Sequence, residues 1–88
     1  MDSYYLLQAK MLLEIGNWRT SIITGWGGMI EYNDWQIHWR WIPSGQVDNI
    51  ELLAKFPNKP NISLHGPLGS ENHPTIFAEI LEKIDVSS

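Results

Sequence analysis

The sequence predicts a small α+β domain of two layers, in which a tryptophan-rich antiparallel hairpin belongs to a three- or four-stranded sheet packed on helices. Residues 3–15 and 74–84 space their apolar side chains as helices do. Residues 19–32 and 35–42 alternate apolar and polar side chains on either side of an Asn-Asp dipeptide, which is typical of a β-hairpin. Residues 1–88 are the length of one globular domain, and its elements are predicted in the order α-β-β-α-β-α.

The first predicted helix, residues 3–15, is apolar over most of its circumference. Asp2 or Ser3 can cap its first turn, and only Ser3, Lys10 and Glu14 form a clear polar stripe along it. A helix that is apolar on most sides must be buried on most sides. The cover can come from the rest of this domain or from a second copy, so the pattern leaves open a homodimer through this helix.

The predicted hairpin places its three tryptophans on one face. With the turn at Asn33-Asp34, alternation puts Trp35, Trp39 and Trp41 on the side of the other apolar residues. We interpret this face as core, or as dimer core, rather than as a platform that stacks a ligand. Emptying the site of one ring by Trp39→Ala is expected to destabilise the domain by about 3–5 kcal/mol. The predicted register pairs Tyr32 with Trp35, Ile30 with Ile37, Gly28 with Trp39 and Trp26 with Trp41.

The second half of the chain is predicted to supply two helices and a strand. Residues 48–56 are assigned to a short helix, because an Asp and a Glu have capping-box spacing and the same Glu precedes a Lys by four positions. Residues 62–65 are assigned to a short strand, which would complete a βαβ crossover with the hairpin. Residues 66–73 are assigned to a loop, and residues 74–84 to a last helix with one apolar stripe and an exposed Glu-Lys pair.

The composition argues against several classes of protein. The net charge is −4 and the six Lys and Arg residues are scattered, which disfavours binding to nucleic acid. The chain has no cysteine, which excludes disulfides, thiolate catalysis and Cys-ligated zinc. We expect a cytoplasmic protein without a membrane segment, because no basic leader and no long apolar run is present. The acidic excess can steer a basic partner toward the protein.

The polar face of the hairpin holds the candidate binding residues. His38 and Arg40 are two positions apart on one strand and therefore point the same way, with Gln36 and Glu31 as expected neighbours. Arginine supplies a planar donor fork and histidine a donor that changes charge near neutral pH, which suits a protein partner or an anion. Trp41 is predicted as an aromatic contact at the end of the hairpin. The alternative is a solvated sheet face on which Glu31 balances Arg40.

No motif in the sequence indicates a specific chemistry. His65, Glu71 and His73 could meet in a loop and bind a metal, but HxxxH and HExxH are both absent. Ser70 has no base at a recognisable spacing. We therefore predict no catalytic residue, no metal site and no cofactor.

Together these features favour a small, acidic, non-enzymatic protein-binding module, such as an inhibitor, an immunity-type protein or an accessory protein. One alternative is a small ligand-binding domain or enzyme that uses His38 and Arg40, or the loop from His65 to His73. Another is a homo-oligomeric structural protein with its first helix at the interface. A His38→Ala/Arg40→Ala variant with unchanged interactions would indicate that this face is only solvated.

Overall fold

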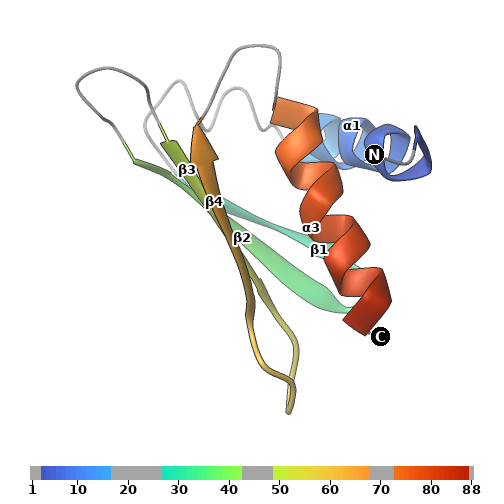
Figure 1. Cartoon of the computed structure of the whole chain (residues 1–88), viewed down its shortest axis with the longest axis vertical. Helices are drawn as coiled ribbons and strands as arrows, with labels where there is room; N and C mark the ends of the chain where they lie inside the picture. The colour runs from blue at the N-terminus through green and yellow to red at the C-terminus, as the bar shows by residue number, and fades with distance from the viewer. Residues whose placement is uncertain (1–2, 17–26, 43–48, 68–72, 88) are drawn as a thin grey trace.

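The computed structural model describes residues 3–16, 27–42, 49–67 and 73–87, and it confirms a small α+β domain. An antiparallel sheet of four strands, in the order β1-β2-β3-β4, forms one layer, and the two described helices lie together on one side of it (Figure 1). The elements are α1 (Ser3–Ile15), β1 (Gly28–Tyr32), β2 (Trp35–Ile42), β3 (Asn49–Lys55), β4 (Ile62–Pro67) and α3 (His73–Ser87).

The first helix and the hairpin follow the sequence-based predictions. Helix α1 has the predicted bounds, and it ends where the Gly16 amide donates to the Leu12 carbonyl at 2.9 Å. Asn33 and Asp34 form the hairpin turn with φ of 50° and 68°, the left-handed values that a two-residue hairpin loop needs. The predicted pairs of Tyr32 with Trp35, Ile30 with Ile37 and Gly28 with Trp39 are confirmed. Residues 19–26 of the predicted first strand, with Trp26, lie outside the described residues.

The helix predicted over residues 48–56 is wrong, because Asn49–Lys55 is strand β3. Ile50, Leu52 and Ala54 alternate along it and are fully buried, which is the period of a strand. A Glu-Lys pair four positions apart stabilises a helix by only about 0.2–0.5 kcal/mol, so burial of that row decides the conformation. Because β3 is antiparallel to both β2 and β4, the predicted βαβ crossover does not form, and the described elements follow in the order α-β-β-β-β-α.

A tight turn joins β3 to β4. The Lys59 amide donates to the Phe56 carbonyl at 3.2 Å, and Asn58 has a φ of 65°. Proline in the second position and asparagine with positive φ in the third are the signature of a type II turn. Pro57 is therefore a turn residue rather than the end of a helix. Strand β4 runs to Pro67, two residues beyond the predicted strand.

The tryptophan face of the sheet is the core, as predicted. Trp35 and Trp39 are 1% and 4% exposed. The Trp39 ring meets Phe77 of α3 edge-on with ring centres 5.9 Å apart, and the Trp35 ring lies 5.3 Å from that of Phe56. Helix α3 is longer than the predicted 74–84, and α1 packs mainly on α3. The buried residues of the two helices are Ala9, Leu13, Phe77, Ala78, Ile80, Leu81 and Ile84.

Candidate functional site

One face of the sheet carries the residues predicted for binding. The described helices pack against the tryptophan face, and within the described part of the chain nothing covers the opposite face (Figure 1). Alternation along each strand directs side chains from all four strands to this surface. We call it the open sheet face, and it consists of Met29, Glu31, Gln36, His38, Arg40, Ile42, Asn49, Glu51, Leu53, Lys55, Ser63, His65 and Pro67.

A row of charged and titratable groups crosses the open sheet face. Arg40 Nη2 lies 3.4 Å from Glu51 Oε1, and the two side chains are 69% and 41% exposed. Strand pairing places His65 directly on the other side of Glu51. An exposed ion pair contributes only about 0–1 kcal/mol to stability, so these groups are available for recognition at little structural cost. In the structure the charge of Arg40 is balanced by Glu51, whereas the sequence-based alternative expected Glu31 in this role.

A second row on the same face mixes polar and apolar side chains. His38 is half-buried, and its Nε2 lies 3.4 Å from Oε1 of Gln36. Across the neighbouring strands it pairs with Met29, which is 45% exposed, and with the half-buried Leu53. Apolar area next to donors and acceptors is typical of the central part of a protein interface.

The open sheet face is hollowed only slightly. Its hollow has a volume of about 200 Å³ and opens to solvent. Sites for small molecules commonly enclose about 300–1,000 Å³, so this shape suits a protein surface better than a small ligand. The hollow is lined by His38, Trp39, Arg40, Glu51, Leu53 and Lys55.

The structure brings four of the five predicted binding residues to one surface. Gln36, His38 and Arg40 project from β2 and Glu31 from β1. Trp41 is half-buried on the tryptophan face, away from the other four, and its role as a partner contact stays a prediction. Within the described residues, its buried indole N–H has no hydrogen-bond acceptor.

Sequence reasoning missed Glu51, Leu53, Lys55 and His65 as members of this surface. The first three were assigned to a helix, and His65 was assigned to a possible metal site. The alternation of Ile50, Leu52 and Ala54 was the available signal, since it marks a strand whose other residues point to the opposite face.

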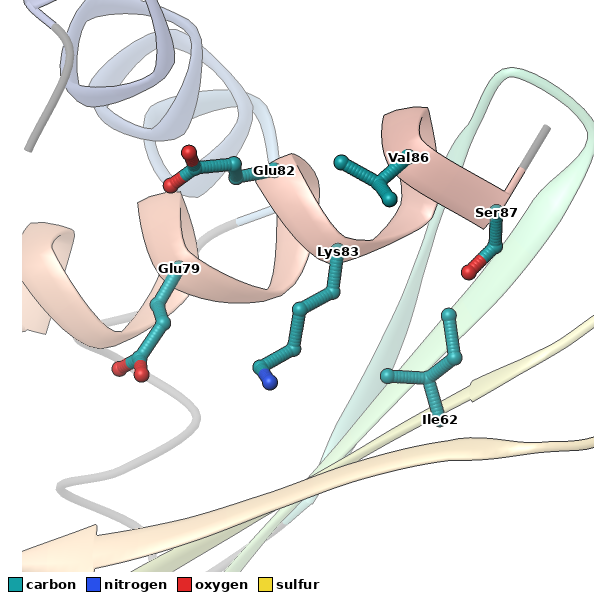
Figure 2. A pocket seen from close by; sticks show the side chains of 6 residues that line it. All are labelled: Ile62, Glu79, Glu82, Lys83, Val86 and Ser87. Atoms are coloured by element: carbon teal, nitrogen blue, oxygen red, sulfur yellow. The ribbon is translucent and has the colours of Figure 1, made fainter.

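A larger hollow of about 510 Å³ lies between α3 and β4 (Figure 2). Figure 2 shows Glu79 and Lys83 reaching from α3 toward the sheet, with Ile62 of β4 directed toward the helix. The predicted pair of Glu79 and Lys83 does not close to an ion pair among the described residues. The hollow is open, and its remaining lining is the outer surface of α3: Glu82, Val86 and Ser87.

The end of the hairpin is tied to α3 by a polar cluster. The Tyr32 hydroxyl donates to the Asp85 carboxylate, with O–O distances of 3.2 and 3.3 Å, and Asn33 Nδ2 donates to the same carboxylate at 3.3 Å. Burial, and after it the negative charge of Asp85, raises the pKa of Tyr32 to about 12. These contacts hold the turn against the C-terminal part of α3, and we assign them a structural role.

Helix α1 exposes a second apolar face. Tyr4, Leu7, Met11 and Ile15 are 53%, 59%, 51% and 74% exposed, whereas Ala9 on the opposite side is fully buried. We call these four residues the α1 stripe. The sequence showed that α1 is apolar on most sides, and in the described part of the chain one of its two apolar faces is buried while the α1 stripe is exposed.

The described residues are not arranged as a metal site. Among the described residues, no group of three His, Cys, Asp or Glu side chains is placed to hold a metal ion. Of the predicted alternative, His65 lies on the open sheet face, while Glu71, Ser70 and the side chain of His73 lie outside the described residues. No described helix is long and apolar enough to cross a membrane.

Comparison with known proteins found no matching family model, no matching curated protein and no matching solved structure. The two exposed surfaces, the open sheet face and the α1 stripe, are therefore the candidate sites of function.

Proposed function

We propose that this chain is a small, non-enzymatic protein-binding module and that the open sheet face is its binding surface. The observation that carries the proposal is the composition of a sheet face that no described helix covers. There the Arg40–Glu51 ion pair lies beside the half-buried His38 and exposed apolar area from Met29. A solvent-exposed sheet face with no binding role is dominated by polar side chains. An interface instead combines apolar area with arginine and directed hydrogen bonds.

The shape of this face supports binding to a protein over catalysis or binding of a small molecule. Its hollow is shallow and open, so a ligand there would keep most of its surface in water. The flat outline instead matches the large contact area of protein partners. An inhibitor, an immunity-type protein or an accessory protein would each use such a surface.

The charge of this chain indicates the net charge of the proposed partner. The open sheet face itself is close to neutral, because Glu31 and Glu51 offset Arg40 and Lys55. The whole chain has a net charge of −4, which speeds the approach of a basic protein and opposes that of a nucleic acid. We therefore propose a basic protein partner, and a cytoplasmic location consistent with the absence of cysteine.

The proposal is tested by reversing one charge on the open sheet face and one elsewhere. A partner is captured from a lysate of the source cells, identified by mass spectrometry and then titrated as a purified protein. Arg40→Glu is expected to weaken binding at least tenfold, since it removes the guanidinium donors that the proposed surface offers to the partner. Lys83→Glu makes the same change of net charge on α3 and is expected to bind within about twofold of the wild type. Unchanged binding by Arg40→Glu and by His38→Ala/Arg40→Ala, both folded, would exclude this surface.

A second candidate function is self-association through α1, and the exposure of the α1 stripe favours it. The largest apolar patch on a typical monomer covers about 300–600 Å² and is often functional. Sedimentation equilibrium of the wild type is expected to show a monomer–dimer equilibrium that Leu7→Glu abolishes. Val86→Glu replaces another exposed apolar residue, on α3, and is expected to leave the equilibrium unchanged.

A further inference from the structure

We infer that the occupant of the α1 stripe is the α1 stripe of a second copy, which runs in the opposite direction about a twofold axis. In this arrangement Tyr4 packs against Ile15 of the second copy, and Leu7 packs against its Met11. The inference rests on the proposed self-association. It adds that each α1 stripe contacts the α1 stripe of the other copy, and that the two helices are antiparallel.

The α1 stripe is continuous along the helix. Its members are spaced three, four and four positions apart, so Tyr4, Leu7, Met11 and Ile15 follow one line on the helix surface. The buried residues Ala9 and Leu13 lie on the opposite side and face the core. Pairing of the stripe therefore leaves the packing of the domain unchanged.

The charges of α1 favour a second copy over a charged partner. Helix α1 carries one cation and one anion, Lys10 and Glu14, and is neutral, although the whole chain has a net charge of −4. Two copies that meet through α1 therefore bring one neutral helix against another, although each chain as a whole is acidic. A neutral apolar stripe offers no charge by which a basic or an acidic protein would be selected.

The area of the α1 stripe predicts a weak and reversible dimer. A helix of 13 residues is about 20 Å long, so four side chains cover its length. Each of the four is at least half exposed, which gives a patch on the order of 400 Å² per copy. Two such patches with their polar margins bury on the order of 1,000 Å², the lower limit for specific interfaces. We expect dissociation in the micromolar range.

Side-chain size and helix dipoles favour the antiparallel direction. Antiparallel pairing sets each large end residue, Tyr4, against the smaller Ile15 at the other end, so the helices keep one separation along their length. Parallel pairing would set two tyrosine rings together at one end and two isoleucines at the other, and the helices would diverge. Antiparallel helices also place opposite ends of their macrodipoles side by side.

The absence of cysteine allows a direct test by site-specific cross-linking. Tyr4→Cys and Ile15→Cys are each prepared as single variants of the full chain, then treated with a short bismaleimide either alone or as an equimolar mixture. Val86→Cys, which is 82% exposed on α3, is the matched control. Products are separated by electrophoresis and their junctions are read by mass spectrometry.

In the equimolar mixture, the cross-link between Tyr4→Cys and Ile15→Cys is expected to be several times more abundant than the self-cross-links of the two variants together. Val86→Cys is expected to cross-link only at background level. Self-cross-links of Tyr4→Cys and of Ile15→Cys that exceed the mixed product would overturn the antiparallel direction while leaving self-association standing. A wild type that sediments as a monomer at every concentration, with cross-links at the level of Val86→Cys, would overturn both the inference and the proposed self-association. Loss of another protein's binding in Leu7→Glu, with a monomeric wild type, would assign the α1 stripe to that protein instead.

Discussion

The contact between Gly28 and the Trp39 ring gives the sharpest test of the core. A Cβ atom added at Gly28 would overlap the indole, lying 2.7 Å from its Cε2 and closer still to its Cζ2. The ring cannot withdraw easily, because Trp39 is 4% exposed and is held against Phe77 of α3. We therefore expect Gly28→Ala to destabilise the domain through overpacking.

Two opposing effects set the change in the free energy of unfolding that Gly28→Ala causes. Overpacking of a well-filled core costs about 1–3 kcal/mol. Replacement of glycine by alanine lowers the entropy of the unfolded chain and returns about 0.4–1 kcal/mol. The net loss for Gly28→Ala is therefore about 1–2 kcal/mol. In a Trp39→Leu background the six-membered ring that the new methyl group meets is gone, so the same substitution is expected to be neutral or slightly stabilising.

The free energy of unfolding is measured by urea titration with circular dichroism for the wild type, both single variants and the double variant. The expected coupling energy between positions 28 and 39 is about 1–3 kcal/mol in favour of the double variant. Gly66→Ala is the control, because its Cβ would meet only the end of the flexible Ile76 side chain at 3.3 Å. An equal cost of Gly28→Ala in both backgrounds would show that the loss of stability does not arise from the Trp39 ring.

Three further predictions concern the hairpin cluster, the open sheet face and the β3–β4 turn. Tyr32→Phe is expected to lower the free energy of unfolding by about 1 kcal/mol at neutral pH, because the hydroxyl donates to the Asp85 carboxylate. Since the folded pKa of Tyr32 is raised from about 10 to about 12, the wild type should lose stability relative to Tyr32→Phe as pH rises through this window, as chemical denaturation at each pH would show. Glu51→Gln should change the free energy of unfolding by less than about 1 kcal/mol, since its ion pair with Arg40 is exposed; a larger loss would make this pair structural. Asn58→Gly should be tolerated and Asn58→Val should cost at least about 1 kcal/mol in the same urea assay, because position 58 has a φ of 65°.

The β3 segment shows where local sequence rules conflict. Glu51 and Lys55 have the spacing of a helical ion pair, yet Ile50 and Leu52 have the spacing of a strand. The helical pair is worth a few tenths of a kcal/mol, whereas burial of a large aliphatic side chain is worth about 1.5–3 kcal/mol. The stronger term decides the outcome only when a sheet is present to receive the segment, which is a property of the whole fold.

On the open sheet face, too, some neighbours can be predicted from one strand and others depend on how the strands pair. The prediction that His38 and Arg40 share a surface needed only alternation along one strand, and the structure places them so. Glu51, which pairs with Arg40, and His65, which pairs with Glu51, come from strands that follow later in the chain. No spacing in the sequence could indicate these neighbours without the pairing of β2, β3 and β4.

Elements that depend on near neighbours in the chain could be predicted from the sequence alone. Helix α1, the hairpin turn and the register from Tyr32 to Gly28 each follow from side chains a few positions apart. The tertiary structure alone decided that residues 49–55 join the sheet, that the described helices cover one face, and that the α1 stripe is left exposed. These outcomes depend on contacts between distant segments, where the free energy of burial outweighs local preference.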